Sequence, residues 1–238
     1  MKNYCLIILL SATALSPAYA EQSYEQALQE GCNKVKQYAR LGKKYYDQKQ
    51  YQHALTEFKN QASWSSFCLL NQDETGLHLT EYDVEVANNN VGLSYAKLGQ
   101  PQWARAWFSL NENSKLSKFN LSQLPPPAAT NNVSGRYVTP SGFGQWSSIT
   151  VKKDKKKYTI HFEGYYFGLR GLIYGPNMGE FSTTMPLNAS STTFKQDQCQ
   201  LQLKFQQNHL IVTQQGEDFA CGFGHNVSAS GTYLKVEN

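Results

Sequence analysis

The sequence has no continuous run of about twenty apolar residues, which is the length that a membrane-spanning helix requires. Its compact apolar run near the start, Leu6–Leu10, is much shorter. That run follows Lys2 and precedes the small-residue segment Ala18-Tyr19-Ala20, an arrangement typical of a cleaved secretory signal peptide. We therefore predict a signal peptide over residues 1–20 with cleavage after Ala20, no transmembrane segment, and export to a bacterial periplasm.

Cysteines are few, and no two of them have the C-x-x-C spacing of a zinc site. Cleavage after Ala20 removes Cys5 and leaves Cys32, Cys68, Cys199 and Cys221. An even number of cysteines in an exported protein favours disulfides over free thiols or metal ligation. Four cysteines allow three pairings, of which the chain layout favours Cys32–Cys68 and Cys199–Cys221, one in each half. Zinc binding is the competing interpretation, but no Cys/His cluster supports it, so we predict no metal.

Catalytic motifs are also missing. The chain has no H-E-x-x-H, no G-x-S-x-G and no phosphate-binding G-x-x-x-x-G-K. Its five histidines are scattered, and the cysteines are expected to be paired rather than free to act as nucleophiles. We therefore predict that the protein is not an enzyme, with no catalytic residues and no cofactor.

The composition changes at Leu124-Pro125-Pro126-Pro127-Ala128-Ala129. Three consecutive prolines cannot continue a helix and favour a stiff polyproline segment. Apolar residues have helical spacing before it and alternate in short runs after it. The predicted fold class is α+β in two domains: a helical domain over 21–123, a proline-rich linker over 124–132, and an antiparallel β-barrel or sandwich over 133–238.

Two stretches of the helical half share one spacing of large and small residues. An aromatic residue follows a glycine by three positions, an alanine follows it by twelve and a second aromatic by sixteen. The two sets are Leu41-Gly42, Tyr45, Ala54 and Phe58, and Val91-Gly92, Tyr95, Ala104 and Phe108. Small residues let two antiparallel helices approach, and the aromatics fill the space around the contact. The spacing therefore predicts two helical hairpins.

This pattern resembles the tetratricopeptide repeat (TPR) over roughly residues 34–110. The glycines are fifty residues apart, whereas tight repeats are about thirty-four apart, so extra residues separate the two pairs. The resemblance implies that residues around each glycine line a concave surface that binds a protein or peptide. It also implies that Arg40 or Lys43 together with Asn90 can hold a peptide carboxylate. The implied binding residues are Arg40, Lys43, Tyr46, Asn89, Asn90, Leu93 and Lys97.

The second half predicts seven or eight short strands. Cys199–Phe205 alternates apolar and polar residues without a break, and Leu210–Gln214 pairs back onto it through a turn. The other expected strands are Gly135–Thr139, Trp146–Val151, Tyr158–Tyr166, Gly168–Tyr174, Phe181–Pro186 and Ser230–Val236. Such a series predicts an up-and-down meander that closes into a small barrel or sandwich.

The segment from Cys221 to Tyr233 also resembles the closing strands of small exported bacterial β-domains, some of which accompany lysozyme-inhibitor-type proteins. Elsewhere in this half, five lysines lie within Lys152–Lys157. That run predicts a solvated hairpin tip, with contact to an anionic envelope surface as an alternative. Export argues against nucleic acid as a partner.

Three functional hypotheses follow. The leading one is a periplasmic scaffold that binds a partner protein or peptide through its TPR-like helices. The second is an inhibitor or immunity-type protein whose β-domain blocks an envelope enzyme such as a lysozyme. The third is a barrel that binds a small apolar ligand and would have a large dry interior.

Overall fold

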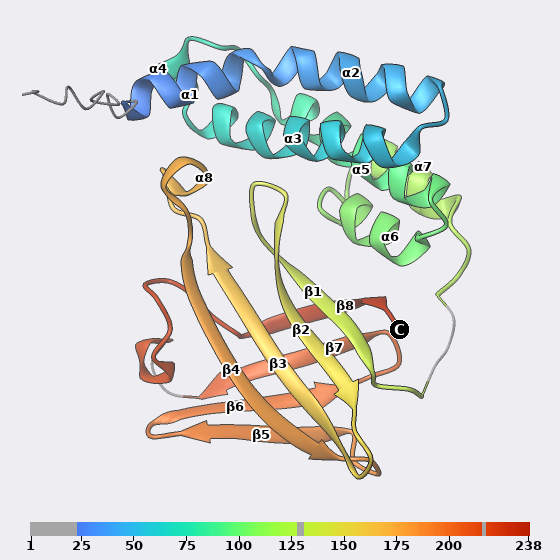
Figure 1. Ribbon diagram of the computed structural model, residues 1–238, viewed down its shortest axis with the longest axis vertical. Helices are drawn as coiled ribbons and strands as arrows, with labels where there is room; N and C mark the ends of the chain where they lie inside the picture. Colours follow the sequence, from blue (N-terminus) through green and yellow to red (C-terminus); the bar gives the residue numbers. More distant parts are fainter. Residues whose placement is uncertain (1–22, 128–130, 216–217) are drawn as a thin grey trace, which may run out of the picture.

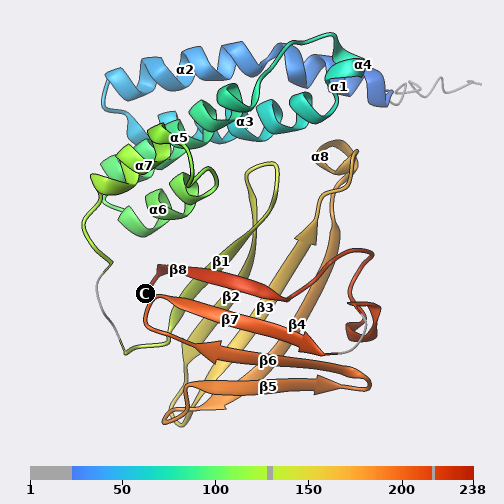
Figure 2. The same cartoon turned by 180° about the vertical axis from the view of Figure 1, so that it is seen from behind.

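A layer of helices covers one end of a barrel-like β-sheet (Figures 1 and 2). The computed structural model describes residues 23–127, 131–215 and 218–238. The predicted signal peptide therefore lies outside the described residues. Within them, no helix combines the length and the apolar character that crossing a membrane would need.

The helical layer contains two long antiparallel pairs, α2–α3 and α5–α6, with shorter helices beside them. Side-chain caps fix two of the helix starts: Ser23 with Gln26 and Thr80 with Asp83 form capping boxes. Pro101 occupies the first turn of α6, where its missing N–H costs nothing. The helices are α1 (Tyr24–Asn33), α2 (Val35–Asp47), α3 (Tyr51–Leu70), α4 (Gln72–Thr75), α5 (Glu81–Lys97), α6 (Pro101–Ser109) and α7 (Lys115–Ser122).

The close helix contacts expected at the two glycines are confirmed. A Cβ atom at Gly42 would lie 2.5 Å from the ring of Phe58, and one at Gly92 would lie 2.3 Å from the ring of Phe108. Both distances are far shorter than carbon atoms tolerate, so only glycine lets each aromatic ring lie against the partner backbone. The two hairpins then stack through α3 and α5.

The strands form one eight-stranded antiparallel sheet in the order β4-β3-β2-β1-β8-β7-β6-β5. Strands β1 to β4 form one meander and β5 to β8 a second, and β8 pairs with β1 to join them, which leaves β4 and β5 at the two edges of the sheet. The strands are β1 (Gly135–Gly142), β2 (Gln145–Lys153), β3 (Lys157–Tyr166), β4 (Asn177–Pro186), β5 (Ser191–Gln196), β6 (Cys199–Phe205), β7 (His209–Gln215) and β8 (Gly231–Glu237). A short helix α8 (Gly171–Tyr174) separates β3 from β4, and a 3-10 turn η1 (Asp218–Cys221) follows β7.

The sheet curls until its two outer strands, β4 and β5, face each other. Side chains close this seam: the rings of Phe181 and Phe194 stack with centroids 4.7 Å apart. The Thr192 hydroxyl donates a hydrogen bond to the carbonyl of Thr184 at 3.0 Å. The predicted antiparallel barrel is therefore confirmed as a barrel-like sheet, and a two-sheet sandwich is not formed.

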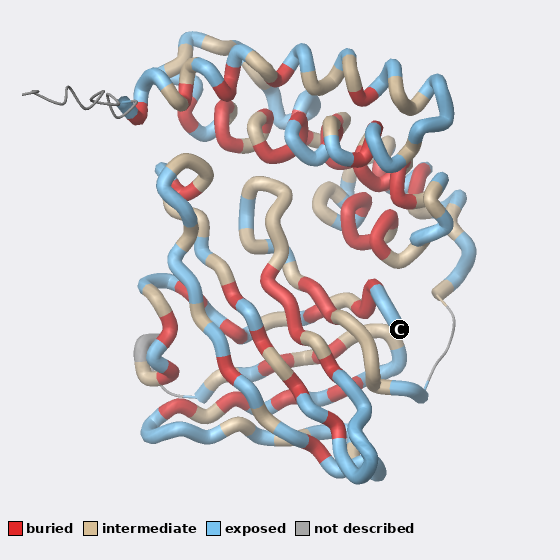
Figure 3. The backbone as a smooth tube through the Cα atoms, viewed as in Figure 1, coloured by how far each residue is buried: buried red, intermediate tan, exposed pale blue. Residues whose placement is uncertain are grey.

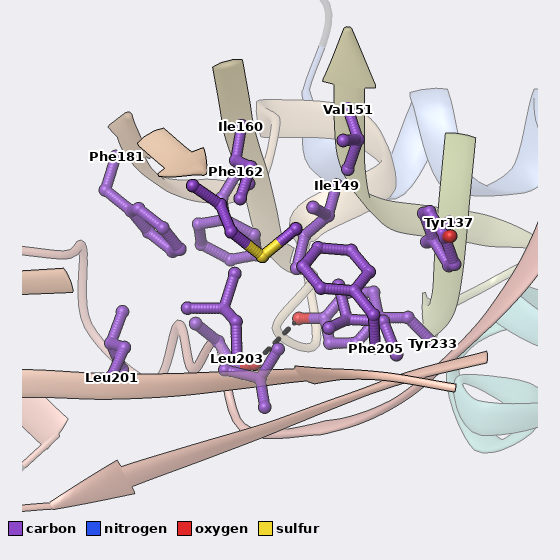
Figure 4. Close-up of a cluster of buried hydrophobic side chains, with 14 of the residues drawn as sticks. Tyr137, Ile149, Val151, Ile160, Phe162, Phe181, Leu201, Leu203, Phe205 and Tyr233 are labelled. Carbon is purple, nitrogen blue, oxygen red and sulfur yellow. Dashed lines mark hydrogen bonds between the residues drawn. The ribbon is translucent and has the colours of Figure 1, made fainter. Parts of the chain in front are cut away.

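Side chains fill the interior of the barrel (Figure 4). Tyr137, Phe162, Leu203 and Tyr233 have no exposed surface. The hydroxyl of Tyr233 donates to the carbonyl of Ala229 at 2.9 Å, so its polar atom is satisfied inside this core. The large dry interior that a ligand-carrying barrel would need is not seen among these residues.

Both predicted disulfides are present. Cys32 in α1 is bonded to Cys68 in α3, and Cys199 in β6 is bonded to Cys221 in η1. The first bridge fastens α1 to the end of α3, and the second attaches the segment after β7 to the sheet. One bridge lies in each half of the chain, as the layout of the cysteines predicts.

Three details of the strand prediction differ from the structure. Gly168–Tyr174 is not a strand but a loop that ends in α8, where Gly171 is buried against Phe167. The residues that form β5 were not predicted as a strand, because its pattern is polar with only Phe194 as a large apolar residue. The strand β4 begins four residues before its expected start at Phe181, since its polar first half pairs in register with β3.

The helices and the barrel share one cluster of apolar side chains. Buried residues of α3, α5 and α6 pack together with Val138 of β1 and Val236 of β8, and Trp146 and Leu234 join from the sheet. Figure 3 shows buried residues on the underside of the helical layer and on the sheet below it. Helix α7 ends at Ser122 and β1 begins at Gly135; within the predicted linker over 124–132, residues 128–130 lie outside the described residues.

Candidate functional site

A groove of about 560 Å³ lies between the helical layer and the adjacent end of the barrel; we call it the interlayer groove. Helices α3, α5 and α6 form one side of it, and strands of the sheet with their connecting turns form the other (Figure 1). Its lining residues are Gln52, Leu55, Lys59, Tyr95, Gln100, Trp103, Trp107, Arg136, Gly144, Gln145, Trp146, Tyr165, Phe167, Pro176 and Glu237.

Three of the four tryptophans of the sequence meet in this groove. The ring of Trp146 meets those of Trp103 and Trp107 edge-on, at centroid distances of 6.1 and 5.6 Å. Trp103 in turn stacks on Tyr95, with centroids 5.5 Å apart and an interplanar angle of 12°. Trp103, Trp107 and Tyr95 are buried, so they form a rigid aromatic floor, whereas Trp146 is half-buried at its edge.

The turn between β1 and β2 brings Trp146 to the helices. Gly144 in this turn has a left-handed backbone conformation with φ of +67°, and a Cβ atom there would lie 2.9 Å from the Trp107 ring. The next residue, Gln145, donates a hydrogen bond from its side chain to the hydroxyl of Ser63 in α3 at 3.2 Å. The hairpin tip is therefore held against the helical layer (Figure 2).

Two cations face the groove from opposite sides. The ammonium of Lys59 on α3 lies 5.1 Å from the centroid of the Tyr95 ring, and the guanidinium of Arg136 on β1 lies 5.8 Å from that of Trp103. Neither cation forms an ion pair with a residue that the structure describes. The lining residues include one carboxylate, Glu237, so the groove carries an excess of positive charge.

The Glu237 carboxylate is held by an indole rather than by a cation. Trp103 Nε1 donates to Glu237 Oε1 at 3.0 Å, although Arg136 lies opposite Glu237 in the pairing of β1 with β8. This hydrogen bond links α6 directly to the last strand of the barrel. One oxygen of the carboxylate is thereby engaged within the wall of the groove.

The surroundings shift two pKa values in this groove. Burial raises the pKa of Tyr95 to about 12, and the negative charge of Glu237 adds to the increase. Burial of the ammonium end lowers the pKa of Lys59, and repulsion from Arg136 lowers it further. The stem of Lys59 is exposed, while its charged end lies over the Tyr95 ring. Burial is the main cause of both shifts, so the site is partly desolvated.

Three buried donors of the groove residues have no hydrogen-bond partner among the residues described: Trp107 Nε1, Trp146 Nε1 and Arg136 Nε. An unsatisfied buried donor costs about 1–3 kcal/mol. Such atoms are uncommon in folded proteins, and several others occur among the described residues outside this groove. These three atoms are themselves covered, so what the groove offers a ligand is ring edges and positive charge.

The seven residues implied by the repeat resemblance lie elsewhere, and none of them lines the interlayer groove. Arg40, Lys43 and Lys97 are exposed, and Lys43 pairs with Asp47 at 2.7 Å. Asn90 is half-buried. Leu93 and Tyr46 pack at the margin of the helical core.

Asn89 differs most from the expectation of an exposed binding residue. It is 2% exposed, and its side chain bonds to Ser117 and Asn120 of α7. These hydrogen bonds attach α7 to α5 inside the helical layer. Asn89 therefore has a structural position in which its amide does not face solvent.

The groove residues themselves were not singled out from the sequence as a site. Tryptophan was the available signal, because it is rare and three of its four positions converge here. Nothing local connects Trp103 with Glu237, which are 134 residues apart. In the sequence, Arg136 is likewise an isolated arginine at the start of a strand. Only the fold places it under α6.

Other candidate sites are less developed. The run Lys152–Lys157 is fully exposed, at the β2–β3 turn on the end of the barrel away from the helices (Figure 1). Among residues 23–127, 131–215 and 218–238, no group of three or more His, Cys, Asp or Glu residues is arranged to hold a metal ion.

Comparisons with protein-family models, with curated proteins and with solved structures find no match for this chain.

Proposed function

We propose that this protein is an exported binding protein without catalytic activity, which holds a partner protein or peptide in the interlayer groove. The observation that carries this proposal is the make-up of the groove. Aromatic rings from α5, α6, β2 and β3 surround two cations that have no ion-pair partner among the described residues. Clustered tryptophan, tyrosine and arginine are the residues most enriched at the energetic centres of protein interfaces.

We further propose that α2–α3 and α5–α6 are TPR-like hairpins. The glycine contacts at Gly42 and Gly92 support this, because each occurs at the same position of its hairpin. The hairpins form one wall of the groove, and the barrel provides the other. A partner would then contact both parts of the chain at once, rather than the exposed face of α2 and α5 alone.

Export to the periplasm belongs to the same proposal. The two disulfides support it, since such bonds persist in oxidising compartments. The sequence pattern of residues 1–20 supports it independently. Activity as an inhibitor of an envelope enzyme is a special case of partner binding, and the experiment below would reveal it through the identity of the captured protein.

The proposal is tested by capture of partners from an envelope extract of the native host. The bait is the mature chain, residues 21–238, as wild type and as the groove variant Trp146→Ala. The matched control is Arg40→Ala/Asn90→Ala, which alters the exposed helical surface and leaves the groove intact. Thermal denaturation of each bait verifies that it is folded before capture.

We expect the wild type and the Arg40→Ala/Asn90→Ala control to retain the same partner, and folded Trp146→Ala to lose most of it. Loss from the control variant alone would contradict binding in the groove and would locate the contact on α2 and α5. Equal retention by all three baits would contradict both locations. Recovery of no partner at all would count against a binding function.

A further inference from the structure

The guanidinium of Arg136 is held in place but not neutralised. Alternation along β1 directs Tyr137 into the barrel and puts Arg136 and Val138 on the outer face, under α6. There the guanidinium lies 5.8 Å from the Trp103 ring centroid, and it forms no ion pair with a described residue. A guanidinium fork in this state can bind a carboxylate through two parallel hydrogen bonds.

The nearest acidic residue does not serve as its partner. Glu237 lies across from Arg136 in the β1–β8 pairing, but its Oε1 accepts the hydrogen bond of Trp103 Nε1 at 3.0 Å. Lys59 approaches from α3 and repels Arg136 rather than balancing it. Two cations against one engaged carboxylate leave the groove electrostatically complementary to an anion.

The surroundings of this charge include apolar side chains. Leu55 of α3, Phe167 after β3 and Pro176 before β4 line the groove together with the tryptophan rings. An anion bound at Arg136 therefore lies next to apolar side chains of the groove. A peptide carboxylate with a neighbouring apolar or aromatic side chain matches both the charge and this apolar surface.

A saccharide fits the groove less well than a peptide does. The lining has an excess of positive charge, and a neutral sugar brings no negative charge to balance it. The faces of Trp103 are covered by Tyr95 and approached by Arg136, so no flat ring face is free there for stacking a sugar.

We propose that the interlayer groove recognises a peptide carboxylate flanked by an apolar side chain, and that Arg136 is the residue that binds the carboxylate. This inference rests on the proposed function and specifies the chemistry of the partner. It differs from binding by Arg40 or Lys43 with Asn90, since those residues are outside the groove. The carboxylate can belong to a chain terminus or to an aspartate or glutamate side chain.

The test is a binding screen with synthetic hexapeptides against the full mature chain. The peptides are acetylated at the N-terminus and randomised at the last three positions. One arm has free C-terminal acids, a second has C-terminal amides without Asp or Glu, and a third has C-terminal amides with one internal Asp or Glu. Oligomers of a uronic acid form a fourth arm. Fluorescence of the groove tryptophans and titration calorimetry measure binding.

We expect peptides from the first or third arm to bind, with their amide counterparts from the second arm at least about tenfold weaker. Binding in the first arm identifies a C-terminal carboxylate, and binding in the third identifies a side-chain carboxylate. Arg136→Gln should weaken the best peptide by about ten- to a hundredfold, and Arg136→Lys by less, because it keeps the charge but loses the fork.

Arg170→Gln is the matched control. Arg170 also lies over an aromatic ring, at 4.6 Å from the centroid of Tyr24, but it is exposed and outside the groove. Its substitution should leave the dissociation constant unchanged. Thermal denaturation of Arg136→Gln shows whether a loss of binding reflects the site or the fold, and Arg136→Lys provides the second variant if Arg136→Gln does not fold.

The proposal is overturned if no peptide binds more tightly than about 1 mM, if peptides with a carboxylate bind no better than the second-arm amides that have none, or if only the uronic acid oligomers bind. Binding that Arg136→Gln and Arg170→Gln weaken equally would overturn it as well. Partner capture that depends on Trp146 together with failure of all carboxylate peptides would refute this inference while leaving the proposed binding function intact.

Discussion

Trp103 Nε1 on α6 donates a hydrogen bond to Glu237 Oε1 on β8, the last strand of the barrel, at 3.0 Å. The two residues are 134 positions apart in the chain. Their contact couples the helical layer to the end of the sheet and also prevents the carboxylate from being fully available to Arg136. Stability and ligand binding are therefore expected to depend on the same bond.

Substitution of Trp103 by phenylalanine should remove this hydrogen bond while keeping an aromatic ring on Tyr95. We expect Trp103→Phe to lower the free energy of unfolding by about 1–2 kcal/mol. Urea denaturation measures the change. Trp64→Phe is the control, because the Trp64 indole makes no hydrogen bond to a described residue and packs against Gly31 instead. Equal losses in the two variants would show that the indole N–H contributes nothing.

The glycine contacts predict an unusual response to alanine. Gly92→Ala should destabilise the protein by about 1–3 kcal/mol because its methyl group would overlap the Phe108 ring. This cost exceeds the gain of about 1 kcal/mol that alanine normally provides inside a helix. The double variant Gly92→Ala/Phe108→Leu should regain part of the loss, as measured by a double-mutant cycle. An alanine variant as stable as the wild type would contradict close packing at this position.

The contribution of each disulfide should grow slowly, as a logarithm, with the length of the loop that it closes. The Cys32–Cys68 bridge spans 36 residues and the Cys199–Cys221 bridge spans 22. On the chain-entropy account, replacing either pair by serine should cost about 3–4 kcal/mol, with the larger loss for the longer loop. Urea denaturation of the two double-serine variants measures this. Non-reducing peptide mapping checks the pairing, and any other connectivity would contradict the structure.

Stability should fall at alkaline pH because buried tyrosines resist ionisation. The pKa of Tyr95 is raised to about 12 in the folded protein, compared with an unfolded value near 10. The folded state therefore binds more protons between these values, so this stabilisation is complete below about pH 10 and is lost as the pH rises towards 12. The linkage amounts to about 2–3 kcal/mol. Tyr137, whose pKa is also raised to about 12 by burial, should act in the same direction.

Denaturation midpoints between pH 8 and 12 test this linkage. Tyr95→Phe should show a shallower decline than the wild type, because it removes one ionisable phenol from the buried floor of the groove. Tyr82→Phe is the control, since Tyr82 is 63% exposed and lies outside the groove. An identical alkaline slope for wild type and Tyr95→Phe would contradict the assignment.

Local sequence patterns predicted most of the elements. The shared spacing around Gly42 and Gly92 identified both hairpins, because a glycine opposite an aromatic residue is readable along a single helical pair. Alternation identified seven of the eight strands, with ends that differ by at most four residues. It failed for β5, whose exposed polar residues carry almost no signal, and for Gly168–Tyr174, where apolar residues serve a loop packed under α1.

The sequence by itself therefore determined the helical hairpins, the antiparallel strands and the two disulfides, because each depends on residues close together in the chain or on a small set of cysteines. Only the tertiary structure decided that the hairpins pack onto the end of the barrel and that Trp103, Arg136, Trp146 and Glu237 meet there. Contacts between residues more than a hundred positions apart leave no periodic pattern in a single sequence. They depend on how the two layers bury their shared apolar surface, and the interlayer groove is a product of that packing.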